Sequence, residues 1–254
     1  MSPRLVFPVM GTMCSIVVAP DDPAAVDPAG VEDAMAVARS LLEALDRRFS
    51  HYRRDSEISR WVAGDDVDAY AAADIAHVLR ECGRLHADSD GVFRARHPQT
   101  GALDTAGYVK GYAIGRAVDA LRDRGLRDFV VGVGGDAYCS GRASRDRPWR
   151  VAIQDPRRSH GVLALLEASD GAVASSGTAE RGDHIWLGRG PVAAGLASFT
   201  VSGPDISLAD AFATIGFAMG EAGMAWVARH AGYRSLVVRA DGTVVGDAAL
   251  VSAA

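Results

Sequence analysis

The sequence predicts an α+β protein built on a largely antiparallel or mixed sheet. Its helices interrupt groups of strands instead of alternating with single strands, and most of the later strands are joined by short turns. The 254 residues, 48% of them hydrophobic, are enough to bury a full core. No long linker, repeat or low-complexity tract divides the chain, so we expect one domain spanning residues 1–254.

The N-terminal half predicts a pair of strands followed by helices. A run rich in Val and Ile surrounds a turn, and apolar residues then recur at helical spacing. The third helix is expected to end at Gly125, because glycine is typical of the position after a helix. The expected elements are strands within 4–19 around a Pro8–Gly11 turn, and helices over about 31–48, 72–88 and 108–124.

The C-terminal half predicts more strands and two further helices. Short β-branched and aromatic runs bounded by turn residues indicate the strands, and the closing pair surrounds an Asp-Gly turn. The expected strands are 129–133, 137–140, 149–153, 162–167, 172–174, 199–201 and a pair around Asp241-Gly242, with helices over 207–219 and 221–231.

Composition excludes several classes of function. A net charge of −5 and no basic run argue against a nucleic-acid binder. No window approaches the ~20 apolar residues of a membrane span, and the start lacks the apolar core of a signal peptide. Cys14, Cys82 and Cys139 fit neither a disulfide framework nor a zinc cluster. We expect a cytoplasmic protein whose cysteines are structural.

Asp210 and Thr214 are four residues apart in an expected helix, so they share one face. A carboxylate and a hydroxyl placed this way could ligate a hard cation such as Mg²⁺, which prefers oxygen ligands. The alternative is a capping box, because Ser207 stands three residues before Asp210. The segment alone favours the cap.

The segment from Asp104 to Asp119 opens a helix with Gly107 and Gly111 near its start. Glycines let a ligand approach the backbone closely, and helix N-termini attract phosphate. Each glycine in a helix interior costs about 1 kcal/mol, so two within five residues need a reason. Close packing of the helix is the alternative, and Lys110 alone would be read as a surface lysine.

Two further segments are ambiguous alone. Val131–Asp136 is glycine-rich, but a strand follows it, so a hairpin turn is favoured over a dinucleotide fold. His184 follows a Ser/Gly turn and could be a structural or exposed histidine. Tyr52 could stack on a flat ring or mark a surface boundary, beside an expected helix cap at Asp55 or Ser56.

Taken in order, these segments resemble the FAD:protein FMN transferase family (ApbE-like). The resemblance covers essentially the whole chain. The matching segments are Met10–Thr12, Tyr52–Arg60, Asp104–Ala113, Gly134–Asp136, Trp149–Pro156, Ser176–Gly177, His184–Ile185 and Ala209–Thr214.

The resemblance implies an α+β fold with a cleft for FAD and a Mg²⁺ ion, with Mn²⁺ as an alternative. FAD would give its FMN half to a Ser or Thr hydroxyl of an acceptor flavoprotein and release AMP. Asp210, Thr214 and the backbone at Gly107 and Ala213 would hold the metal. Asp210 and His184 would be the catalytic residues, with His184 as the implied base that takes the proton of the acceptor hydroxyl. The implied cofactor-binding residues are Met10, Tyr52, Val92, Phe93, Asp104, Lys110, Gly134, Gly135, Asp136, Ser176, Gly177, His184 and Ile185.

Two departures from the family pattern leave the function open. The run after His184 is Ile-Trp-Leu-Gly-Arg-Gly-Pro, where the family has an Asp-Pro-x-Thr-Gly segment, and Arg94 replaces a carboxylate. Both lie on the expected flavin-facing and acceptor-facing walls. The alternative to the transferase is an FAD-binding protein that no longer modifies proteins, acting as a hydrolase, carrier or repurposed enzyme. A nicotinamide-dependent oxidoreductase is disfavoured by the strand that follows Asp136.

Overall fold

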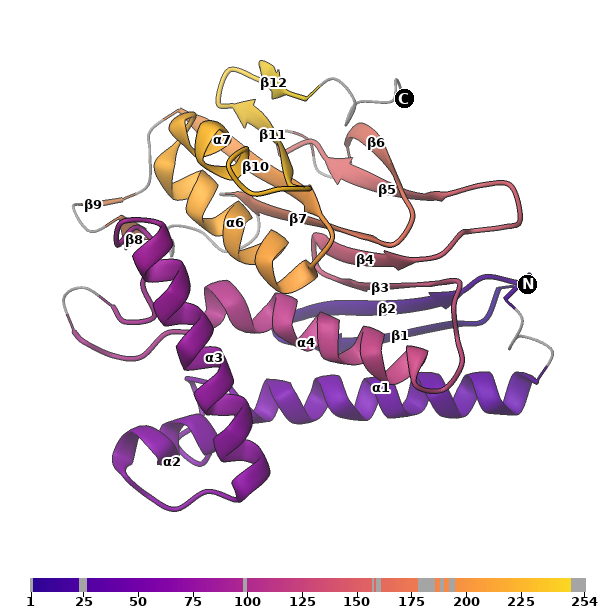
Figure 1. Ribbon diagram of the computed structural model, residues 1–254, viewed down its shortest axis with the longest axis horizontal. Coiled ribbons are helices and arrows are strands. Elements are labelled where there is room, and N and C mark those ends of the chain that lie inside the picture. Colours follow the sequence, from indigo (N-terminus) through magenta and orange to yellow (C-terminus); the bar gives the residue numbers. More distant parts are fainter. Residues whose placement is uncertain are drawn as a thin grey trace.

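The computed structural model describes residues 2–22, 27–97, 100–156, 158, 161–177, 186–187, 190–191 and 195–247. An eight-stranded sheet forms its centre, with helices against one face and a two-stranded hairpin against the other (Figure 1). All strand pairs among the described residues are antiparallel, which confirms the predicted α+β class. In sheet order, the strands are β1 (Arg4–Val9), β2 (Thr12–Val18), β3 (Phe129–Val133), β4 (Asp136–Ser140), β7 (Gly171–Gly177), β10 (Leu196–Gly203), β11 (Arg234–Arg239) and β12 (Val244–Gly246).

The remaining elements lie outside this sheet. The hairpin consists of β5 (Trp149–Gln154) and β6 (Val162–Ala168), and a short pair is formed by β8 (Trp186–Leu187) and β9 (Gly190–Pro191). The helices are α1 (Pro28–Arg48), α2 (Glu57–Ala63), α3 (Ala69–Asp88), α4 (Ala106–Arg122), α6 (Ile206–Met219) and α7 (Ala222–Val227). Within the described part of the chain, no helix is both long and apolar enough to cross a bilayer.

Two apolar cores lie on opposite faces of the sheet. The larger one joins the sheet to the helices through alternate strand residues and the apolar stripes of α1, α4 and α6. The smaller one lies under the β5–β6 hairpin and is formed by Cys139, Ile153, Ala164, Leu166, Ala168, Val173 and Leu236. The hairpin is therefore fixed to the sheet by its own core.

Most predicted elements appear within a few residues of their expected ends, but the short pair β8 and β9 was not predicted and two helices differ. The sequence analysis omits α2, although Ser56 caps it as expected by accepting a hydrogen bond from the backbone N–H of Ser59. The last helix, expected over 221–231, ends at Val227. The Gly125 backbone has φ +85°, as expected for a glycine that follows a helix.

The three cysteines are buried and unpaired. Burial raises the pKa of Cys14, Cys82 and Cys139 to about 12 each, so their thiols stay protonated at neutral pH. This agrees with the structural role expected from the sequence.

Helices α4 and α6 touch backbone to backbone at Gly111. A Cβ atom there would lie 2.6 Å from the Ile206 carbonyl oxygen and 2.8 Å from the Ser207 Cα. Only a residue without a side chain fits, so close helix packing explains this glycine.

We expect Gly111→Ala to lower the free energy of unfolding by about 2 kcal/mol, because the added methyl forces two backbones apart. Gly115 on the same helix is the matched control. A Cβ there meets Ile206 and Ser207 side-chain atoms at 3.5 and 3.6 Å, which is ordinary contact. Gly115→Ala should be neutral or stabilising by up to about 1 kcal/mol. Equal denaturation midpoints for the two variants would contradict the close contact.

Candidate functional site

A buried ion cluster forms where α4, α6 and the start of β4 meet. The ammonium of Lys110 lies 2.6 Å from Asp136 Oδ2 and 3.5 Å from Asp210 Oδ1. Asp136 is 1% exposed and Asp210 2% exposed. The three groups carry a net charge of −1 in a setting where charges need compensation. The structure thus brings together three of the residues predicted from the sequence.

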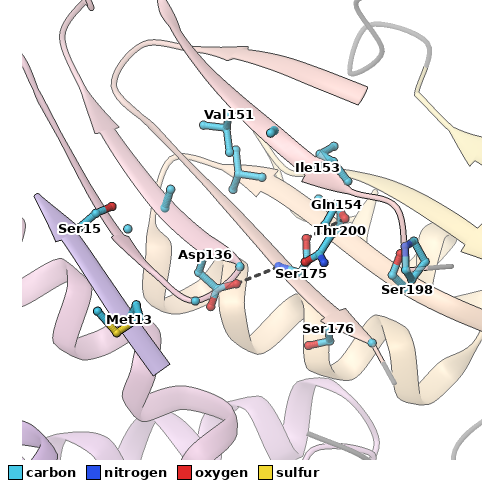
Figure 2. A pocket seen from close by; sticks show the side chains of 18 of the residues that line it. Met13, Ser15, Asp136, Val151, Ile153, Gln154, Ser175, Ser176, Ser198 and Thr200 are labelled. Carbon is cyan, nitrogen blue, oxygen red and sulfur yellow. Dashed lines mark hydrogen bonds between the residues drawn. The ribbon is translucent and has the colours of Figure 1, made fainter. Parts of the chain in front are cut away.

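Asp136 follows the Gly134-Gly135 turn between β3 and β4, as expected for a hairpin. Backbone pairing of β4 with β7 ends at Ala137 and Val173. Beyond that point, Asp136 Oδ1 accepts the backbone N–H of Ser175 at 2.9 Å, as Figure 2 shows. The Asp136 carboxylate therefore extends the contact between β4 and β7 through a side chain. The same bond fixes the carboxylate next to Lys110.

Asp210 lies within α6 and is not its cap. The capping reading is wrong, because Asp205 is the N-cap and its side chain accepts the N–H of Leu208. Asp210 Oδ2 instead accepts the backbone N–H of Gly111 in α4 at 2.8 Å. That N–H would ordinarily pair with the carbonyl of Gly107, four residues earlier.

Thr214 lies one helical turn after Asp210 and faces the end of β7. Its hydroxyl is 3.3 Å from the Ser176 hydroxyl. A methyl built on Gly107 would lie 3.4 Å from the Thr214 methyl and 3.1 Å from the Phe93 ring. Gly107, Ser176 and Thr214 therefore lie next to one another, beside the ion cluster.

The oxygens here suit a hard divalent cation. The described residues contain no group of three or more His, Cys, Asp and Glu side chains that could hold a metal. A metal would depend on the Asp210 carboxylate, the Thr214 hydroxyl and carbonyls of Gly107 and Ala213. Mg²⁺ commonly binds through one or two carboxylates plus phosphate oxygens. The net negative charge of the ion cluster favours a further cation.

A histidine that the sequence analysis missed positions the start of α4. Thr105, the fully buried N-cap of α4, donates its backbone N–H to His51 Nε2 at 3.1 Å. Burial lowers the pKa of His51, while the charge of Asp104 raises it. The His51 ring is therefore neutral, because its Nε2 must be unprotonated to accept the hydrogen bond from the Thr105 N–H. Asp104 itself accepts the N–H of Ala106. No sequence signal distinguished His51 from the other histidines.

The expected flavin-lining residues differ in exposure. Met10 has φ 52° in the β1–β2 turn, and its N–H donates to Asp46 Oδ2 at 3.0 Å. Tyr52 is fully exposed, Val92 is half-buried, and Phe93 is buried against Gly107. Arg94, one of the departures from the family pattern, donates to the Gly91 carbonyl of its own loop.

His184 and Ile185 lie outside the described residues. Of the segment that departs from the family pattern after His184, only the backbone of β8 and β9 is described.

Comparisons with known proteins show which family and which fold the chain resembles. The chain matches the ApbE family over residues 10–96 and 94–237. An FAD:protein FMN transferase of Vibrio cholerae is 25% identical over 240 residues, covering 71% of this chain and 72% of that protein. A protein of the same name from Haemophilus influenzae is 23% identical over 246 residues, covering 72% and 71%.

Solved structures share the fold. A point variant of the flavin transferase ApbE from Vibrio cholerae superposes with a TM-score of 0.79 at 22% identity, covering 98% of both chains. The ApbE protein from Thermotoga maritima gives a TM-score of 0.80 at 21% identity, covering 97% of both chains.

Proposed function

This chain is a member of the ApbE family, and on that basis we propose that it is an FAD:protein FMN transferase. FAD would pass its FMN half to a Ser or Thr hydroxyl of an acceptor protein. The hydroxyl oxygen bonds to the FMN phosphorus, the bond from that phosphorus to the bridging oxygen breaks, and AMP leaves. The proton of the hydroxyl goes to a base. We place this protein in the cytoplasm, where its unpaired thiols stay reduced.

The buried cluster of Lys110, Asp136 and Asp210 is the observation that carries the proposal. Phosphoryl transfer depends on positioning and on neutralising phosphate charge. Lys110 supplies a positive charge that Asp136 holds at 2.6 Å from within the sheet. Because the Lys110 side chain is 11% exposed, its charge acts in a largely water-excluded setting. It would contact the phosphate oxygens on which negative charge develops.

Mg²⁺, or Mn²⁺ in its place, would be held by Asp210, Thr214 and the carbonyl oxygens of Gly107 and Ala213. When bound, such an ion neutralises pyrophosphate charge. The hydrogen bond from Gly111 to Asp210 Oδ2 fixes the carboxylate, so its orientation does not depend on a ligand.

FAD would lie along the residues around this centre. Asp104 stands at the start of α4, where N–H groups attract phosphate oxygens. The exposed ring of Tyr52 offers a face for stacking. Met10, Val92, Phe93 and Ile185 complete the proposed flavin side, and Gly134, Gly135, Ser176 and Gly177 border the phosphates.

We propose His184 as the base, because imidazole can accept a proton near neutral pH. His184→Ala is expected to slow FMN transfer about 10²-fold or more with little change in FAD affinity. Single-turnover rates and FAD titration measure the two quantities. Equal losses of rate and affinity would make His184 a flavin contact, and unchanged turnover would remove the base role.

Incubation with FAD and Mg²⁺, with and without a Ser/Thr-containing acceptor, tests the proposed function. AMP that appears only with acceptor, together with FMN-labelled acceptor, is the expected result. AMP without any acceptor would indicate an FAD hydrolase, which the altered segment after His184 favours as the second candidate. Binding of FAD without AMP release would indicate a carrier.

A further inference from the structure

A cavity of about 360 Å³ lies between the β5–β6 hairpin and the sheet face opposite the helices. Figure 2 shows its lining, with Val151 and Ile153 on the hairpin and Ser15, Ser175, Ser198 and Thr200 on the sheet. Its volume falls within the range of ligand pockets, roughly 300–1,000 Å³. Its lining includes residues proposed to border the FAD phosphates, Gly134, Gly135, Asp136, Ser176 and Gly177, but neither of the aromatic residues proposed for the flavin.

On the sheet side of this hairpin cavity, many of the lining residues have small side chains, and several of them carry hydroxyls. Gly132 and Ala137 leave room, and the Ser175 and Thr200 hydroxyls bond to each other at 2.9 Å. The Ser198 hydroxyl has no hydrogen-bond partner in the described part of the chain, although Ser198 is only 8% exposed. An unsatisfied buried polar group costs about 1–3 kcal/mol. Ser198 therefore indicates a polar ligand group in the cavity.

The hairpin cavity reaches the proposed reaction centre from the far side of the sheet. Asp136 and Ser176 line the cavity, yet Asp136 contacts Lys110 and Ser176 contacts Thr214 on the helix side. At this point β4 and β7 are no longer paired through their backbones, and the hydrogen bond from Ser175 to Asp136 spans them instead. A molecule in the cavity could thus present one end to phosphates held by the helices.

In-line phosphoryl transfer requires the attacking and leaving oxygens on opposite sides of the phosphorus. Lys110 and Asp210 belong to α4 and α6, so they would hold the pyrophosphate on the helix face. The attacking hydroxyl must then come from another direction. The hairpin cavity lies on the opposite face and is lined in part by Asp136 and Ser176, which contact the helix side.

We propose that the hairpin cavity holds an extended segment of the acceptor protein, with its Ser or Thr hydroxyl directed to the Asp136 end. The proposal rests on the transferase function. The cavity volume of about 360 Å³ and the hydroxyls on its sheet side favour a segment of small polar residues over one with bulky side chains. Ser198 would bond to a polar group of that segment.

Gly132→Leu tests the occupant by filling the cavity. A Cβ at Gly132 has Ser15 Oγ at 3.4 Å as its nearest atom, so a side chain meets no backbone clash. Val6→Phe is the control. It adds the same four carbons on the same sheet face, at an exposed residue two strands away that does not line the cavity.

The substrate is a pool of short synthetic peptides, each with one central Ser or Thr flanked by Gly and Ala. A second pool has Leu and Phe flanks. We expect Gly132→Leu to raise KM for the first pool at least about tenfold, while FAD affinity and AMP release to water stay unchanged. Ser198→Ala should raise KM about threefold to tenfold, the scale of one hydrogen bond. Val6→Phe should match the wild type, and the wild type should label the first pool preferentially.

Unchanged KM in Gly132→Leu would overturn the proposal while leaving the transferase function intact. Parallel loss of FAD affinity in Gly132→Leu and Ser198→Ala would overturn it by assigning the cavity to FAD. Better labelling of the bulky pool would contradict the small-residue occupant. If the wild type binds FAD but labels no peptide and no protein, the transferase function itself fails. Denaturation midpoints report separately whether each variant folds.

Discussion

Asp210→Asn is expected to remove the metal dependence of FAD binding and to slow FMN transfer about 10³-fold or more. The charge stabilisation that a bound cation provides is worth several kcal/mol. Asn keeps nearly the same shape, and its amide oxygen can still accept the Gly111 N–H. It loses the negative charge that attracts a cation, and its amide group would face the Lys110 ammonium, 3.5 Å from Asp210 Oδ1.

Asp205→Asn is the matched control, because it makes the same change on the same helix. Asp205 is exposed and caps α6, and Asn caps helices equally well. Calorimetric titration of FAD with and without Mg²⁺ measures the effect in both variants. If Asp210→Asn binds FAD with the same metal dependence as Asp205→Asn, the proposed metal role of Asp210 is wrong.

Lys110→Met is expected to reduce both stability and activity. Two buried carboxylates, Asp136 and Asp210, would then lose the ammonium between them. Breaking a buried ion pair by removing one partner costs about 3–5 kcal/mol. Transfer should fall about 10²–10³-fold, because one electrostatic contact to the phosphates disappears.

Arg239→Met is the control for charge removal. Its ion pair with Glu221 has the same 2.6 Å distance, but both side chains are well exposed. Exposed pairs contribute little, so its denaturation midpoint should match the wild type. A denaturation midpoint for Lys110→Met that matches that of Arg239→Met would contradict the buried-charge explanation.

The sequence predicted the helices and strands better than it predicted the contacts between them. Apolar periodicity located α1 and α3, because their buried stripes repeat every turn. The seven residues of α2 were missed, since so short a helix has few periods to detect. The final helix was predicted too long because its sequence permits more turns than the fold retains.

The candidate site illustrates why local patterns mislead. Ser207 and Asp210 have the spacing of a capping box, yet Asp205 caps α6 and Asp210 bonds to Gly111, 99 residues earlier. His51 contacts Thr105 across 54 residues and left no local signal. Pairing of this kind depends on which helices pack together, and a pattern of neighbouring residues does not contain that information.

The contact of α4 with α6 at Gly111 also has a consequence for the rate of the proposed reaction. Because backbone meets backbone there, the relative position of the two helices that carry Lys110 and Asp210 is set by main-chain packing. The charged groups are preorganised, and their rotational entropy is lost once, when the chain folds. Each substrate then binds to dipoles and charges that are already oriented toward the reacting phosphate. Little reorganisation energy is therefore added to the activation barrier of each turnover.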